Sequence, residues 1–172
     1  MSEAAQTGPR LEPAASAPGH RIRAAGHEDV DVVVESVREL LAELGGTPAG
    51  VPAMRAAVRA ILDSPAAGIV LLAEAEAEDA VVGVLAASWQ IAIHVPGSYA
   101  LIQDLWVHPA WRSRSLGAEL VTALVEAARA RDMERVEVGL PRERFAGFAA
   151  TEAFYLSNDF QPLGPRMRRV LG

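Results

Sequence analysis

The chain has 172 residues, of which 51% are hydrophobic, and a formal net charge of −6. This length and apolar content are enough for one sizeable core, and the absence of cysteine excludes disulfides, thiol nucleophiles and cysteine-ligated metal sites. The acidic balance argues against nucleic-acid binding, which needs a basic face, and no apolar run approaches the length of a membrane span. We therefore expect a cytoplasmic protein without nucleic-acid or membrane partners.

The N-terminal segment differs in composition from the rest of the chain. Residues 1–19 are rich in alanine, proline, serine and glycine, and they lack the basic start and the continuous apolar stretch of a secretory signal. Such a segment buries too little apolar surface to fold by itself. The sequence thus predicts a disordered tail over residues 1–19, followed by a single domain over residues 20–172.

Helical and strand patterns alternate along this domain. Apolar residues at three- and four-residue steps indicate helices, short apolar or alternating runs indicate strands, and Gly45-Gly46 is typical of a helix end. The predicted elements are a strand at Arg21–Ala24, helices at His27–Leu44 and Val51–Leu62, strands at Ile69–Glu74, Val81–Ala92 and Tyr99–Val107, a helix at Leu116–Arg131, a strand at Arg135–Leu140, a helix at Ala149–Leu156 and a last strand within Phe160–Val170. This order predicts an α/β fold.

The segment between Val107 and Leu116 is the most informative part of the chain. His108-Pro109 ends the preceding strand, because proline lacks a backbone donor and restricts the residue before it. Arg112-Ser113-Arg114-Ser115-Leu116-Gly117 then opens a helix, where the first backbone N–H groups are unpaired and the helix dipole adds positive charge. This loop is typical of a phosphate or pyrophosphate site.

Two common phosphate-binding patterns do not fit this loop. The Walker A pattern requires a lysine, and the chain has none. The dinucleotide fingerprint requires three glycines, whereas Gly117 is the single glycine of the loop. A third pattern, R/Q-x-x-G-x-G/A, agrees with Arg112, Leu116 and Gly117, and Ser115 stands where its first glycine usually lies.

That third pattern belongs to the GNAT superfamily of acyl-CoA-dependent N-acyltransferases, which the chain resembles from about Arg21 to Val170. The preceding DLWVHPAWR is similar to the fourth strand of the family and its exit. Downstream, AFYLSNDF at residues 153–160 resembles the LYxxxGF segment of the family, with Asp159 in the usual glycine position. The order and separation of the two motifs favour this interpretation.

The resemblance implies a GNAT fold: a mixed central sheet, splayed between strands four and five by a bulge in strand four and flanked by helices. Acyl-CoA would enter the gap, and its pantetheine arm would pair with the open edge of strand four at Leu105, Trp106 and Val107. The pyrophosphate would lie on the loop and the start of the helix, where the implied binding residues are Arg112, Ser113, Arg114, Ser115, Leu116, Gly117 and Ala118.

The implied reaction transfers an acetyl group from acetyl-CoA, as cosubstrate, to a primary amine of a small molecule. Tyr155 is the implied general acid for the CoA sulfur, since a phenol with a solution pKa of about 10 keeps its proton at neutral pH. Asp104 or a chain of waters would act as the base. A protein acceptor and a non-catalytic acyl-CoA-binding sensor stay open as alternatives.

Several further expectations concern partners and departures from the family pattern. No His, Asp and Glu residues have metal-ligand spacing, so no metal is expected, and the oligomeric state stays open, with a homodimer as one option. Ser115 adds a side chain where the backbone must approach phosphate, and Asp159 stands where an unusual φ is expected. Between Leu140 and Tyr155 the chain is longer than the family pattern, and we interpret residues 141–147 as a substrate-side or interface loop.

Overall fold

The computed structural model describes residues 19–93, 97–164 and 169. The elements in chain order are β1 His20–Ala24, a 3-10 turn η1 at His27–Asp29, α1 Val30–Glu43, α2 Val51–Leu62, β2 Gly68–Ala75, β3 Ala80–Ile91, β4 Ser98–Val107, a 3-10 turn η2 at Pro109–Trp111, α3 Leu116–Arg129, β5 Val136–Val138 and α4 Phe148–Ser157. None of these helices of the described chain is long and apolar enough to cross a membrane.

The predicted elements are confirmed in type and order as far as α4. Residues 160–164 form no strand, so that part of the predicted last strand is wrong, and most of its remainder lies outside the described residues. The predicted tail over residues 1–19 also lies outside them, apart from Gly19. The predicted strand Arg135–Leu140 shortens to Val136–Val138, because it finds backbone partners over three residues of β4.

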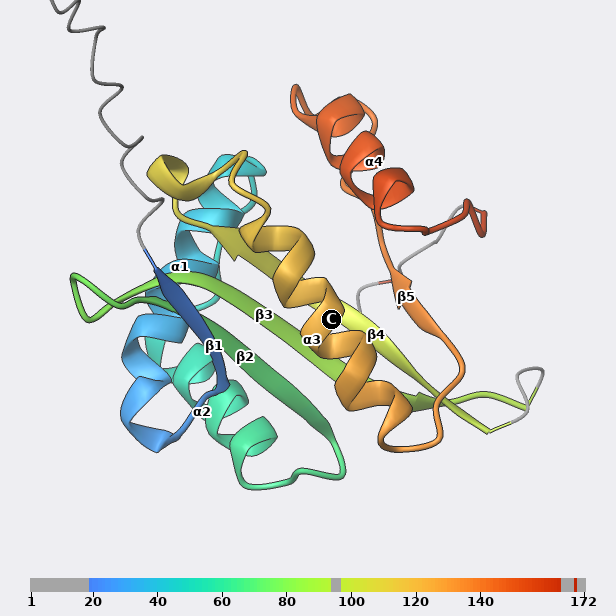
Figure 1. The fold of residues 1–172 in the computed structure, drawn as a ribbon, viewed down its shortest axis with the longest axis horizontal. Helices are drawn as coiled ribbons and strands as arrows, with labels where there is room; N and C mark the ends of the chain where they lie inside the picture. The colour runs from blue at the N-terminus through green and yellow to red at the C-terminus, as the bar shows by residue number, and fades with distance from the viewer. Residues whose placement is uncertain (1–18, 94–96, 165–168, 170–172) are drawn as a thin grey trace, which may run out of the picture.

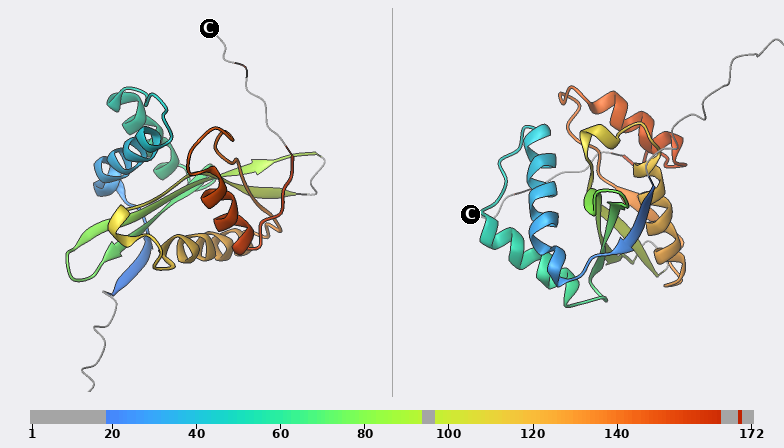
Figure 2. Two further views of the ribbon diagram at one scale, coloured as in Figure 1. Left: turned by 90° about the horizontal axis from the view of Figure 1, so that it is seen from above. Right: turned by 60° about the vertical axis from the view of Figure 1, so that its left-hand side comes forward.

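The five strands form one mixed sheet in the order β1-β2-β3-β4-β5 (Figure 1). Neighbouring strands run antiparallel except β4 and β5, which are parallel. Figure 2 shows α1 and α2 on one face of the sheet and α3 and α4 on the other. Each face carries its own buried apolar cluster, one under α3 and the other under α1 and α2.

Helix α3 packs on the sheet through one apolar face. Its buried residues are Leu116, Leu120, Val121, Leu124 and Ala128. The helix comes close to β3 at Gly83, where an added Cβ would lie 3.0 Å from a Leu120 methyl group. This close approach fixes the start of α3 next to the end of β4, where the phosphate-type loop lies.

An ion-pair cluster under β1 explains why α1 starts later than predicted. Asp29 accepts hydrogen bonds from Arg23 (Nη1 to Oδ2, 2.6 Å) and from the Gly26 N–H (2.7 Å). Arg23 also pairs with Glu74 of β2. The hydrogen bonds from Arg23 hold the pKa of both carboxyl groups below the usual range. Because these contacts fix Asp29, residues 27–29 form a 3-10 turn, and the α-helix begins at Val30.

Strand β4 contains the bulge that the family resemblance predicts. Ala87 of β3 faces Ile102 and Ala86 faces Asp104, so Gln103 is the extra residue. Parallel pairing with β5 covers Ala100–Ile102 and stops at this bulge. The sheet therefore splays between β4 and β5, and the half of β4 after Gln103 has an edge without a β5 partner.

Candidate active site

The bulge at Gln103 decides which face of the sheet each β4 side chain occupies. Before it, Ala100 and Ile102 belong to the cluster under α3. After it, Leu105 packs on that same cluster, whereas Trp106 belongs to the cluster under α1 and α2. Since side chains alternate with a period of two, one extra residue reverses the alternation. Asp104 therefore faces α1 and α2 rather than α3.

Asp104 lies in an apolar environment on this face. It lines a cavity of about 130 Å³ together with aliphatic residues and Met54 of α1, α2, β2 and β3. Burial raises the pKa of the Asp104 carboxyl above its ordinary value of 3.8, and no hydrogen-bonding partner offsets the cost among the described residues. A carboxylate kept in such a place costs stability unless a ligand pairs with it.

Replacing Asp104 with asparagine should therefore increase the free energy of unfolding at neutral pH. The folded state holds the Asp104 proton to a higher pH than the unfolded state does, so stability falls as the pH rises from 3.8 to the raised pKa, and the deficit persists above it. The gain should vanish below pH 3.8, where the carboxyl is protonated in both states. Urea unfolding at both pH values measures this, with Asp63→Asn as the exposed control. Equal stability of Asp104→Asn and wild type at neutral pH would contradict the desolvation cost.

The open edge of β4 is partly occupied by contacts within the protein. The Arg112 Nε donates to the Val107 carbonyl at 2.9 Å, so this acceptor already has a partner. The His108 N–H, by contrast, donates at 2.9 Å to the Val82 carbonyl of β3, on the paired side of β4. Trp106 is buried, and its indole N–H has no hydrogen-bond acceptor within the described part of the chain. The sequence indicated backbone recognition at this edge, and it gave no sign of the unpaired indole.

The loop before α3 adopts the left-handed backbone conformation that glycine prefers, although serines occupy the two positions. Ser113 and Ser115 have φ values of 60° and 65°, in the left-handed region that glycine prefers. The helical hydrogen bonds begin with the Glu119 N–H, which donates to the Ser115 carbonyl at 2.9 Å. The N–H groups of residues 116–118 precede that bond and have no acceptor within the helix.

Replacing Ser115 with glycine should stabilise the protein by about 1 kcal/mol, because the left-handed conformation costs an L side chain more than the extra backbone entropy of glycine. Chemical denaturation measures the difference. The matched control is Ser64→Gly in the loop after α2, where φ is not positive and glycine should destabilise. Loss of stability in Ser115→Gly would mean that the serine side chain makes a stabilising contact that outweighs the backbone cost.

The two loop arginines have different environments. Arg112 is anchored, because its Nη2 also donates to Glu43 at the end of α1 over 2.6 Å. The guanidinium of Arg114 lies 5.5 Å from the centre of the Trp111 ring, in a cation–π arrangement. Arg114 is exposed, and it is the loop cation better placed to meet a ligand. Arg112 instead ties the loop to a helix far away in the sequence.

Gly117 has a packing role that the sequence interpretation missed. A Cβ at this position would lie 3.3 Å from the ring of Phe154 and 3.7 Å from a Val107 methyl group. The first turn of α3 thus meets α4 and the end of β4 at this glycine. The ring of Phe154 lies next to that of Tyr155, with centroids 5.1 Å apart.

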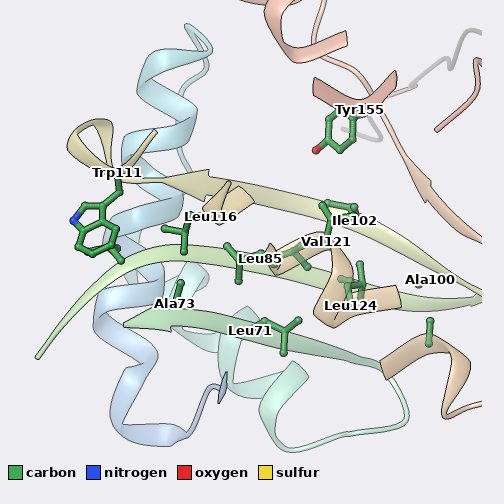
Figure 3. Packing of buried hydrophobic residues seen from close by; sticks show 14 of the residues in the cluster. Leu71, Ala73, Leu85, Ala100, Ile102, Trp111, Leu116, Val121, Leu124 and Tyr155 are labelled. Atoms are coloured by element: carbon green, nitrogen blue, oxygen red, sulfur yellow. The ribbon is translucent and has the colours of Figure 1, made fainter. Parts of the chain in front are cut away.

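Tyr155 lies on the face of the sheet opposite to Asp104. It is 7% exposed and belongs to the cluster under α3. Figure 3 shows its side chain projecting from α4 with the hydroxyl oxygen directed away from the helix. Edge-to-face contacts with Phe154 and Phe160 hold the ring. Burial alone raises the pKa of Tyr155 to about 12, so the phenol stays protonated at neutral pH.

Asp159, which precedes Phe160, has a φ of 65°, as expected from its place in the motif.

A wider cavity of about 1200 Å³ opens between the end of α1 and the segment after β5. Residues 140–142 and 144–146 line one side, and residues 41 and 43–47 line the other. Glu43, the partner of Arg112, is among them. The loop at residues 141–147 that the sequence analysis identified thus borders a cavity next to the loop before α3.

A mixed sheet that splays after a β4 bulge, with a left-handed loop opening the next helix, is the GNAT arrangement. A model of the acetyltransferase (GNAT) family matches residues 34–157, and the chain belongs to this family. Family membership supports acetyltransferase activity. No curated protein sequence matches the chain.

Solved structures agree with this fold at low sequence identity. A predicted acetyltransferase from Clostridium acetobutylicum, solved with acetyl-CoA, is 14% identical with a TM-score of 0.75, over 88% of this chain and 96% of that one. An aminoglycoside 6'-N-acetyltransferase from Acinetobacter baumannii is 14% identical with a TM-score of 0.72, over 90% and 100%. Glucosamine-6-phosphate N-acetyltransferase from Arabidopsis thaliana is 13% identical with a TM-score of 0.71, over 90% and 99%.

Proposed function

We propose that the protein transfers the acetyl group of acetyl-CoA to the primary amine of a small molecule, by direct attack and with Tyr155 as general acid. The observation that carries this proposal is the pair of ionisable side chains on opposite faces of the splayed sheet. Tyr155 is a protonated phenol on the α4 side, and Asp104 is a carboxyl group on the α1 and α2 side. A thioester in the gap would have an acid on one side and a base on the other.

The donor half of the site would use the open β4 edge and the loop before α3. The edge at Leu105–Val107 has no β5 partner, so its backbone groups, apart from the Val107 carbonyl that Arg112 occupies, would pair with the amides of a pantetheine arm. The unpaired N–H groups of residues 116–118 and the exposed Arg114 offer donors and charge to a pyrophosphate. Acetyl-CoA in the Clostridium acetobutylicum structure supports the same cosubstrate for this chain.

Side chains of this protein and solvent can carry out the proton transfers that the reaction needs. The neutral amine attacks the thioester carbon, so a C–N bond forms, the C–S bond breaks, and CoA leaves as a thiolate. The Asp104 carboxylate, or water, takes the excess proton from the nitrogen. The Tyr155 hydroxyl donates to the sulfur as negative charge develops. With a pKa of about 12, Tyr155 holds its proton more tightly than a thiol with a solution value of about 8.5. Its contribution is therefore mainly a hydrogen bond to the leaving sulfur, and solvent completes the protonation.

The deciding experiment measures thiol release from acetyl-CoA across a panel of amines that includes alkylamines, aminosugars and a peptide with a free N-terminus. Saturable, amine-dependent release with formation of the acetamide supports the proposal. Turnover of the peptide alone would move the acceptor class to proteins. Saturable binding of acetyl-CoA without turnover of any amine would overturn the proposal in favour of a non-catalytic acyl-CoA-binding module.

A further inference from the structure

The small cavity at Asp104 is bounded by two helices and three strands. It has a volume of about 130 Å³, and it is lined by Val33, Val34, Val37, Met54, Ala57, Val58, Ile61, Val70, Ala86 and Asp104. The α2 residues of this set recur at three- and four-residue steps, so they form one stripe of the helix facing the sheet. The cavity is therefore built from regular elements, and its shape is fixed by their packing.

The floor of the cavity is a row of side chains across the sheet. Val70 of β2 pairs with Ala86 of β3, and Ala86 pairs with Asp104 of β4. Asp104 is the one charged residue among the lining residues, all of which are described. It lies at the β4 end of this row, directly after the bulge at which the pairing of β4 with β5 stops.

We propose that this cavity holds the apolar body of the acceptor amine and that Asp104 binds its nitrogen, so that the enzyme prefers compact aliphatic or aromatic primary amines. This inference rests on the proposed function, and it names the substrate class for the same site. An ammonium at Asp104 would pair with a carboxylate that has no partner among the described residues. Binding the amine thus relieves the cost of keeping this carboxylate in an apolar cavity.

The size and lining of the cavity set limits on the acceptor. A dry apolar cavity of about 150 Å³ in another protein binds benzene, so 130 Å³ suits a group of about five or six carbons. The lining has no hydroxyl, amide or cation to pair with sugar hydroxyls or a phosphate. A sugar or a phosphate there would lose its hydrogen bonds to water without replacement. An aminosugar or a phosphorylated amine therefore does not fit this cavity.

The test compares kcat/KM for straight-chain amines from propylamine to octylamine, benzylamine, glucosamine and phosphoethanolamine at saturating acetyl-CoA. We expect kcat/KM to rise about fourfold for each added methylene, the factor that corresponds to about 0.8 kcal/mol. The rise should stop near six carbons, about where the cavity is full. Glucosamine and phosphoethanolamine should be poor acceptors.

A matched pair of variants tests whether this cavity causes the preference. Ala57 is exposed yet lines the cavity, so leucine is tolerated there and occupies part of the space. Ala57→Leu should move the optimum to chains about three carbons shorter and lower kcat/KM for hexylamine at least tenfold. Ala56→Leu places the same side chain at an exposed α2 position outside the cavity, and it should leave the chain-length profile unchanged. Melting temperatures confirm that both variants fold.

The outcomes separate this inference from the proposed function. Turnover that favours glucosamine or phosphoethanolamine, or a chain-length profile that Ala57→Leu does not change, would overturn the inference and leave the acetyltransferase proposal intact. If acetyl-CoA binds and no amine turns over, the proposed function fails. In that case, calorimetry can still test the cavity as an amine site. Hexylamine binding that Ala57→Leu weakens and Ala56→Leu does not would support the site, and absence of hexylamine binding would overturn the inference as well.

Discussion

Replacing Tyr155 with phenylalanine should lower kcat by about a hundredfold, the low end of the usual range for general acid–base groups. The low end is expected because a thiolate leaves readily and because a phenol with a pKa of about 12 gives up its proton reluctantly. The substitution keeps the ring, so the edge-to-face contacts with Phe154 and Phe160 persist. Melting temperature and acetyl-CoA affinity should therefore stay close to those of the wild type, and steady-state kinetics with calorimetry measures all three.

The matched control is Tyr99→Phe, which removes the same hydroxyl from the other tyrosine of the chain, at the start of β4. It should leave kcat unchanged. Full activity of Tyr155→Phe on the best acceptor would show that the leaving sulfur needs no hydrogen bond from Tyr155. A fall in kcat accompanied by a large fall in melting temperature would instead indicate that the hydroxyl supports packing of α4.

Gly117→Leu should eliminate saturable binding of acetyl-CoA. Leucine favours the helix, so α3 itself should not be weakened. The Cβ of the new side chain, however, would already lie 3.3 Å from the Phe154 ring and 3.7 Å from a Val107 methyl group, and its other carbons would extend beyond that. It must therefore displace α4 or cover the start of α3, where the unpaired N–H groups lie. Calorimetric titration of acetyl-CoA measures the loss, and Thr122→Leu, at an exposed position of the same helix, is the control with unchanged affinity.

A double variant separates the two possible causes of this loss. Gly117→Leu combined with Phe154→Ala makes room for the leucine by removing the ring that it meets. If affinity returns, Gly117 serves mainly to seat α4 against α3. If affinity stays lost while the protein is folded, the leucine blocks the approach of the pyrophosphate to the helix start. Normal binding by the single variant would refute the assignment of this loop to CoA.

The sequence predicts the helices well because their signal is local. The apolar steps of α2 give Val51–Leu62, the range that the structure has, and those of α3 give its start at Leu116. The predicted bounds of an element are less accurate where contacts with another segment determine where the element begins or ends. The β5 strand is limited to three residues by its pairing with β4, and α1 loses its first turn to the contacts of Asp29 with Arg23 and Gly26.

By itself the sequence determined the order of elements, the family and the identities of the candidate site residues, since these depend on neighbours along the chain. Tertiary structure alone decided where those residues lie and what they contact. The extra residue Gln103 turns Asp104 towards α1 and α2. Arg112 is bound to Glu43, and Gly117 meets Phe154. Each of these outcomes depends either on strand register or on contacts between segments far apart in the sequence. Local periodicity of the sequence contains no information on register or on such contacts.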